Sequence, residues 1–128
     1  MDVHCDIIKI NPLADDSLNF NHIIFRICLK KGVDGSNINY IIHFINTLIN
    51  GGALKIIVDM KEMEYIDSSG IGAFIKTAKI IRANKGEIAF LDVPSQIKDI
   101  FKIVKLQNFI KILHSETEVL NFFSFLIE

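Results

Sequence analysis

Short runs of β-branched residues alternate along this chain with longer segments that repeat apolar residues at helical spacing. The helical period runs from Ile38 to Ile49, from Ile71 to Ile81 and from Ile97 to Val104. The strand-like runs are Val3–Ile10, His22–Leu29, Leu54–Val58, Glu87–Leu91 and Phe109–Leu113. Because a helix between two strands is a right-handed crossover onto a parallel sheet, this alternation predicts an α/β sandwich with a mostly parallel sheet of four to five strands.

The two ends of the chain carry signals of their own. Residues 11–21 are rich in turn formers, so we expect the first two strands to form an antiparallel N-terminal edge. The run Ser115–Glu118 has the spacing of a capping box and predicts the start of a final helix. Its expected buried stripe is Val119, Phe122, Phe123 and Leu126. At 128 residues, we expect residues 1–128 to form a single domain.

Composition narrows the possible functions. The net charge is −1, which argues against nucleic acid or an anionic membrane as the main partner. No apolar run approaches the ~20 residues of a membrane span, and residues 1–6 lack a leader pattern, so we expect a cytoplasmic protein without membrane insertion. Cys5 and Cys28 have no metal-ligand spacing and are expected to be reduced core thiols. We expect neither a metal nor a cofactor.

The segment from Asp59 to Gly72 follows a predicted strand and enters a helix, and open α/β sheets bind ligands at such positions. Capping alone would explain Asp67, Ser68 and Ser69, whose oxygens can accept the unpaired amides of the first turn. Two glycines, at positions 70 and 72, are not needed for a cap, and each costs ~1 kcal/mol inside a helix. They suggest close approach by a partner or a phosphate.

Enzyme motifs do not match this segment. Gly70-Ile71-Gly72 has Ile75 where a dinucleotide fingerprint needs Gly or Ala, and no Gly-Lys-Ser/Thr run supplies a P-loop. Neither Ser68 nor Ser69 has glycines two residues before and two after it, as a nucleophile elbow requires. His114 is more simply explained as structural than as a base. The sequence therefore predicts a non-enzymatic protein.

The run Tyr65–Gly72, YIDSSGIG, resembles the Asp-Ser-Ser/Thr-Gly-hydrophobic-Gly signature of STAS domains, specifically of bacterial anti-sigma factor antagonists. Asp59, the Gly86-Glu87 strand entry and the Val93-Pro94 helix opening followed by Phe101 also sit as in that family. The resemblance covers roughly residues 3 to 126. It implies a STAS-like sandwich with helices packed mainly on one face of the sheet.

The resemblance also implies a function. Proteins of this kind bind an anti-sigma factor that is itself a serine kinase, and they thereby release a sigma factor for transcription. The kinase phosphorylates the serine after the motif aspartate, here Ser68, and a cognate serine phosphatase is expected to reverse the reaction. Asp67 matches the adjacent acid and Asp34 resembles a second acid near the phosphorylation site. This chain departs from the family at Lys31-Gly32, where Gly-Glu is usual, and in its longer 11–21 connection.

Physical reasoning and the resemblance together predict a partner-binding surface. Its expected members are Asp34, Asp67, Ser68, Ser69, Gly70, Ile71, Gly72, Lys76 and Lys79. The two lysines belong to a stretch without acidic residues, from Ser68 to Gly86, which is equally explained as a solvated face complementing the helix dipole. Two alternatives stay open: a STAS scaffold or transport-associated regulatory subunit that is never phosphorylated, and a small serine hydrolase.

Overall fold

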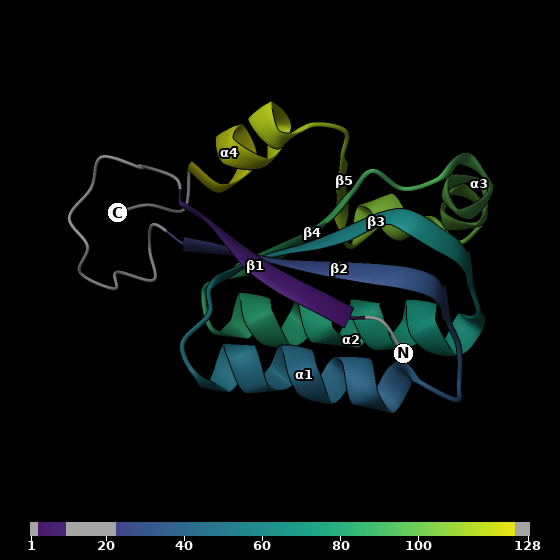
Figure 1. Ribbon diagram of the computed structural model, residues 1–128, viewed down its shortest axis with the longest axis horizontal. Coiled ribbons are helices and arrows are strands. Elements are labelled where there is room, and N and C mark those ends of the chain that lie inside the picture. The colour runs from purple at the N-terminus through teal and green to yellow at the C-terminus, as the bar shows by residue number, and fades with distance from the viewer. Residues whose placement is uncertain (1–2, 10–22, 125–128) are drawn as a thin grey trace.

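The computed structural model describes residues 3–9 and 23–124 (Figure 1). The expected 11–21 connection therefore lies outside the described residues. The described elements, in chain order, are β1 (Val3–Lys9), β2 (Ile23–Val33), α1 (Ile38–Asn50), β3 (Lys55–Ile66), α2 (Ser68–Ala83), β4 (Glu87–Leu91), α3 (Ser95–Ile103), the 3₁₀ helix η2 (Leu106–Asn108), β5 (Lys111–Leu113) and α4 (Glu116–Ser124).

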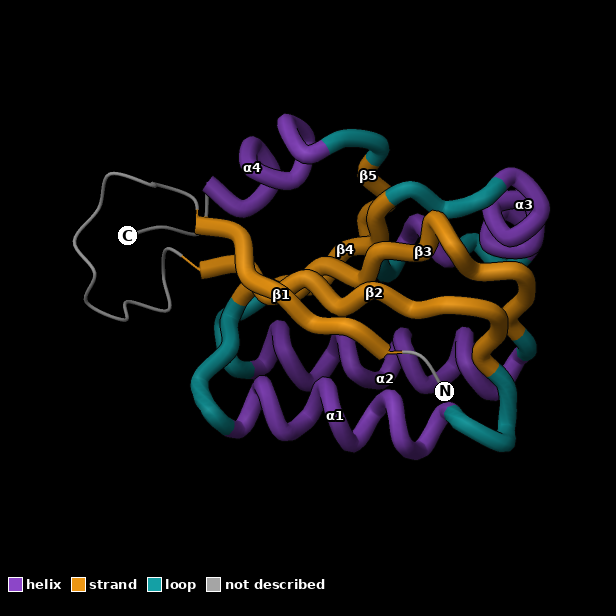
Figure 2. Tube along the Cα trace, in the orientation of Figure 1, coloured by secondary structure: helices purple, strands orange, loops and turns teal. Residues whose placement is uncertain are grey.

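The strands form a single five-stranded sheet in the order β1-β2-β3-β4-β5. The β1–β2 pair is antiparallel, and the β2–β3, β3–β4 and β4–β5 pairs are parallel. Helices α1 and α2 lie side by side on one face, and α4 covers part of the opposite face (Figures 1 and 2). The predicted α/β sandwich, its antiparallel N-terminal edge and its unequal helix layers are confirmed.

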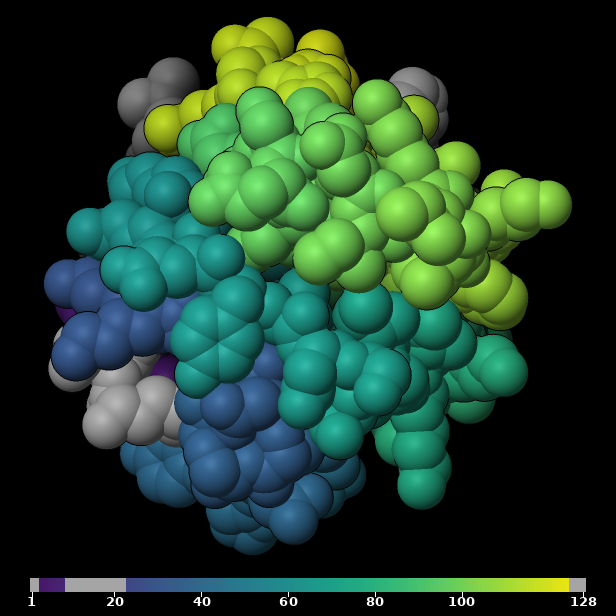
Figure 3. Space-filling model, turned by 90° about the vertical axis from the view of Figure 1, so that its right-hand side faces the viewer, coloured from purple at the N-terminus to yellow at the C-terminus, as the bar shows by residue number. Residues whose placement is uncertain are grey.

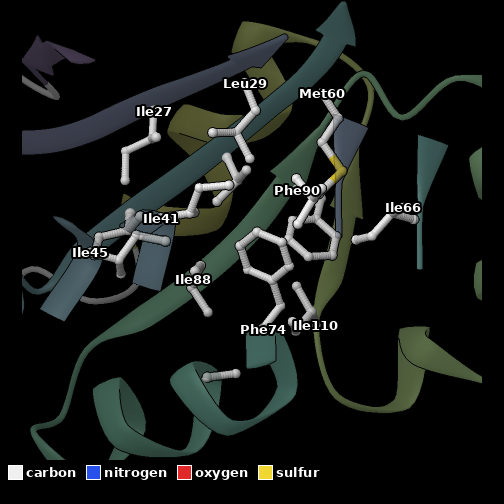
Figure 4. Packing of buried hydrophobic residues seen from close by; sticks show 14 of the residues in the cluster. Ile27, Leu29, Ile41, Ile45, Met60, Ile66, Phe74, Ile88, Phe90 and Ile110 are labelled. Carbon is white, nitrogen blue, oxygen red and sulfur yellow. The ribbon is translucent and has the colours of Figure 1, made fainter. Parts of the chain in front are cut away.

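The main core lies between the sheet and the α1–α2 layer (Figure 4). Three fully buried rings connect its layers: Phe90 of β4 lies 5.3 Å from Phe74 of α2 in an edge-on contact and 5.4 Å from Phe101 of α3 in a stacked one. A smaller core under α4 includes Val119 and Phe123. With apolar residues buried on both faces, the parallel strands read as continuous hydrophobic runs in the sequence.

Strand β3 is much longer than predicted. The sequence indicated a strand ending at Val58 and an acidic connection after it, whereas β3 continues to Ile66. Its pairing with β2 shifts register twice, and the buried apolar residues beyond Val58 are Met60, Met63 and Ile66, three apart instead of two. The bulges interrupt the two-residue alternation by which a half-buried strand is recognised.

The region around α3 corrects two further predictions. Of the expected apolar stripe on α3, Ile97 and Phe101 are buried, but Ile100 and Val104 are 37% and 44% exposed. The strand expected over Phe109–Leu113 begins only at Lys111, because the chain first makes the 3₁₀ turn η2. Both errors arise where a short helix leaves the sheet and the chain turns back to it.

The helix start predicted at Ser115 is confirmed, although Glu118 accepts the N–H of His114 and not that of Ser115 as in a standard capping box. The Ser115 Oγ accepts the Glu118 backbone N–H at 3.2 Å, and the Glu118 carboxylate accepts the His114 N–H at 2.8 Å. Val119 and Phe123 are buried as expected and Phe122 is half-buried, while Leu126 lies outside the described residues. The backbone N–H of His114 therefore belongs to a helix cap.

Both cysteines are free, as expected, but neither lies deep in the core. Cys5 pairs with Ile27 in the β1–β2 register and packs against the main core. Cys28 pairs with His4 and its Sγ lies 4.0 Å from a carboxylate oxygen of Asp59. Burial is the largest cause that raises the pKa of both thiols, and this disfavours the reactive thiolate.

Lys55, the first residue of β3, is fully buried, and its Nζ has no hydrogen-bond partner among the described residues. Burial without a partner disfavours the charged form and lowers the pKa of this ammonium below its ordinary value. The unfolded chain keeps the ordinary pKa of lysine. At pH values below the folded-state pKa, the buried charge of Lys55 therefore lowers the stability of the fold. That cost is relieved as the pH rises from the folded-state pKa toward the ordinary one.

We predict that Lys55→Met raises the free energy of unfolding at neutral pH by about 1 to 3 kcal/mol, because it removes an unpaired buried amine and keeps the volume. Urea denaturation measures this, with Lys111→Met at an exposed position of β5 as the control. A less stable Lys55→Met variant beside an unchanged control would show that the amine is satisfied in solution.

Candidate functional site

The site lies at the edge of the sheet where the parallel strands end, beside the first turn of α2. Asp67 separates β3 from α2 and adopts an extended backbone. Its carboxylate accepts the Gly70 N–H at 3.1 Å, so the predicted capping role of Asp67 is confirmed. Its own N–H donates to the Val33 carbonyl at 3.0 Å, which fastens this turn to the end of β2.

The two serines occupy the first two positions of α2, and both are exposed. They differ in their surroundings. A Cβ placed on Gly35, in the loop between β2 and α1, would lie 3.8 Å from the Ser69 Oγ. Ser69 therefore borders this loop. Ser68 is the first residue of α2, where free backbone N–H groups favour an anion.

The two glycines of the motif have different roles. Gly70 is buried, and a Cβ there would lie 2.8 Å from Val33 and 2.9 Å from Ile66. Gly72 is exposed, and a Cβ there would meet nothing within 4 Å. The expectation that a partner lies flat against both glycines is therefore wrong for Gly70, whose missing side chain serves internal packing.

Ile71 also points inward. Its side chain is 8% exposed and belongs to the main core. Gly70 and Ile71 are therefore removed from the expected contact surface.

The exposed face of α2 carries Ser68, Gly72, Lys76 and Lys79, which we call the α2 stripe. Steps of four, four and three residues place these four positions on one side of the helix. Farther along, Arg82 is held by Glu87, with 2.8 Å between its Nε and a carboxylate oxygen, and it also donates to the Phe109 carbonyl. The basic stretch thus divides into the two exposed lysines of the α2 stripe, an arginine held by Glu87 and the exposed Lys85 beyond the helix.

Asp34 lies at the same end of the molecule, in the loop between β2 and α1. One carboxylate oxygen accepts the backbone N–H of Ser36 at 2.8 Å and its hydroxyl, and the other accepts the Tyr65 hydroxyl at 2.8 Å. These hydrogen bonds, that of the Ser36 hydroxyl first, hold the pKa of Asp34 below its ordinary value. Asp34 is therefore an ionised, oriented group.

Tyr65 is a residue that the sequence reasoning quoted within the motif without assigning it a role. It pairs with Gly32 in the β2–β3 register, and its ring occupies the space that a Cβ on Gly32 would take. A pairing of glycine with an aromatic residue across two strands becomes visible only when the register is known. The bulges in β3 hid that register.

Figure 3 shows this end of the molecule, where the β2–α1 loop in blue, the start of α2 in teal and α3 in green meet at the surface. Among the described residues, no group of three or more His, Cys, Asp and Glu side chains is placed to hold a metal ion. No helix among them has both the length and the apolarity to cross a membrane. What the described part presents at this end is two exposed serines, a helix N-terminus and the carboxylates of Asp34 and Asp67.

Comparison with known proteins agrees with this arrangement. The STAS domain model matches residues 18–119. The anti-sigma-B factor antagonist of Staphylococcus aureus is 32% identical over 68 residues, which are 53% of this chain and 62% of that protein. The chain matches between about half and two thirds of the length of such curated relatives.

Solved structures show the same fold. An anti-sigma factor antagonist from Mycobacterium paratuberculosis aligns with a TM-score of 0.73 at 8% identity, over 96% of this chain and 95% of its own. The phosphorylated form of the Bacillus cell fate determinant SpoIIAA aligns with a TM-score of 0.62 at 18% identity, over 92% and 97%. With a family match over most of its length, the chain belongs to the STAS domain family.

Proposed function

We propose that this protein is an anti-sigma factor antagonist, which binds an anti-sigma factor serine kinase and is switched off by phosphorylation of Ser68. The observation that carries the proposal is the position of Ser68, an exposed hydroxyl at the start of α2 beside the capping carboxylate of Asp67. The relatives are named anti-sigma-B factor antagonists, which supports an anti-sigma factor as the partner. Release of a sigma factor follows from competition for the same anti-sigma factor.

The docking surface that we propose is the α2 stripe with Ser69 and Asp34 beside it. Gly72 leaves the backbone of the first turns open, because a Cβ there would have no neighbour within 4 Å. A partner can therefore approach the helix closely at the serines. Lys76 and Lys79 extend this surface and fit an acidic region of the partner.

Phosphorylation would change this surface without changing the core. Transfer of the γ-phosphoryl group from ATP to the Ser68 Oγ, with release of ADP, adds about −1.5 to −2 charges. The helix N-terminus partly stabilises these charges within the protein. The partner would meet a bulky dianion beside Asp67, whereas Gly70 and Ile71 on the inner side of the same turn stay packed.

The competing functions differ in what they would bind. Recovery of the protein with its partners from native cell extract, followed by mass spectrometry, separates them. A small ATP-binding kinase supports the proposal, whereas a large scaffold or a permease complex supports the non-phosphorylated alternatives. Hydrolase activity lost on Ser68→Ala would instead support an enzyme.

We predict that the recovered kinase, given ATP, phosphorylates Ser68 and leaves Ser69 unmodified, because the Ser69 hydroxyl borders Gly35 in the neighbouring loop. Peptide mapping of the product, with Ser68→Ala and Ser69→Ala as matched controls, decides between the two. Phosphate on Ser69, or phosphate that persists in Ser68→Ala, would overturn the assignment.

Ser68→Asp should weaken association with the anti-sigma factor at least tenfold while the melting temperature changes little, since an acid is well tolerated at a helix N-terminus. Ser68→Ala should still bind. Calorimetric titration of both variants measures the difference. Equal affinities would show that the serine acts only as part of the helix start.

The glycine pair offers a matched comparison. Gly72→Ala should stabilise the protein by about 1 kcal/mol through helix propensity and should weaken partner binding, because the new methyl group projects from the docking surface. Gly70→Ala should instead destabilise by about 1 to 3 kcal/mol, because its methyl group would overlap Val33 and Ile66. Denaturation and binding curves for both variants test this, and unchanged affinity of Gly72→Ala would remove Gly72 from the surface.

A further inference from the structure

The last part of β3 is bent by a bulge that determines where Tyr65 points. Lys31 of β2 pairs with Met63, but the next residue, Gly32, pairs with Tyr65, so Glu64 is skipped. Bulges next to functional sites commonly redirect a side chain. Here the redirected ring lies over Gly32, and half of the Tyr65 side chain remains exposed.

From this position the Tyr65 hydroxyl reaches the loop between β2 and α1. It donates to the Asp34 carboxylate at 2.8 Å, and the opposite oxygen of that carboxylate is held by Ser36. The loop is also braced from within, because the Asn37 side chain accepts the Asp34 N–H and donates to the Gly32 carbonyl. Tyr65 thus supplies a side-chain contact between this braced loop and the end of β3.

The loop that Tyr65 holds lies directly against the first turn of α2. Gly35 borders the Ser69 hydroxyl, and the Val33 carbonyl accepts the Asp67 N–H. A change in the loop would therefore move Asp34 relative to the serines. The exposed side chains at this end would no longer present one fixed arrangement to a partner.

We propose that Tyr65 is a positioning residue, which fixes Asp34 and the β2–α1 loop in the arrangement that the anti-sigma factor recognises. This inference rests on the proposed function. Gly32 is also needed for this position of Tyr65, because only a residue without a Cβ leaves room for the ring. The affinity of the protein for its partner then depends on a tyrosine hydroxyl that does not itself have to touch that partner.

The first test needs no partner. Titration of the Asp34 carboxyl carbon by NMR in the unmodified protein, in Tyr65→Phe and in Tyr40→Phe shows whether the hydroxyl holds Asp34. We expect the pKa of Asp34 to rise toward its ordinary value in Tyr65→Phe, because a donor to the charged form is lost. Tyr40, an exposed tyrosine on α1, serves as the matched control. An unchanged pKa of Asp34 in Tyr65→Phe would overturn the inference.

The second test measures affinity for the anti-sigma factor. Tyr65→Phe keeps the ring and removes the hydroxyl, whereas Gly32→Ala keeps the hydroxyl and displaces the ring, since the new Cβ would lie 2.1 Å from ring atoms. We expect each to weaken binding about tenfold, with a melting temperature within a few degrees of the unmodified protein. Tyr40→Phe should bind normally.

A double-mutant cycle with Asp34→Asn separates positioning from direct contact. If Tyr65 acts through Asp34, adding Tyr65→Phe to Asp34→Asn should weaken binding by less than twofold further. Full additivity, or normal affinity of Tyr65→Phe while Ser68→Asp abolishes binding, would overturn the inference and leave the proposed function standing. Failure of the unmodified protein to bind any anti-sigma factor would reject the proposed function and this docking role together, and the NMR titration would still report whether Tyr65 holds Asp34.

Discussion

The parallel pairing of β2 with β3 is the interaction on which the site depends. Its regular part places β3 at the centre of the sheet, with buried residues on both faces. Its far end is irregular, and there the two register shifts bring Tyr65 opposite Gly32 and Ile66 opposite Val33. The Asp67–Val33 hydrogen bond and the Tyr65–Asp34 hydrogen bond both follow from that alignment. In a regular ladder Gly32 would pair with Glu64, and Tyr65 would not lie opposite Gly32.

Helix α2 combines two separate tasks within one turn. Its inner side, with Gly70 and Ile71, closes against Val33 and Ile66, and the lack of a side chain at position 70 allows that approach. Its outer side exposes Ser68 and leaves open space at Gly72. Because the two sides do not share side chains, a charge added outside need not disturb the packing inside. Under the proposed function, this separation would let phosphorylation of Ser68 change binding while the protein remains folded.

Sequence reasoning succeeded where a local pattern determines the outcome and failed where contacts distant in sequence do. The β4 strand, the α1 helix ending before Gly51 and the capping box at Ser115 follow from spacing within a few residues. The extension of β3 could not be predicted, because its buried residues are three apart when the bulges are present. For the same reason Tyr65 had no assigned role. Gly70 and Gly72 look alike in sequence, and the positions of Val33 and Ile66 in the fold distinguish them.

The strain at the end of β2 gives a physical reason to connect this region with function. Lys31 has a positive φ of 65°, a conformation that costs a lysine free energy which a glycine at this position would avoid. The residue that follows, Gly32, has no side chain and so accommodates the ring of Tyr65. Backbone stability alone would favour a glycine at position 31, whereas at position 32 a Cβ would lie 2.1 Å from ring atoms of Tyr65. The observed residues cost backbone stability at Lys31 and leave room at Gly32 for the ring of Tyr65, whose hydroxyl donates to Asp34.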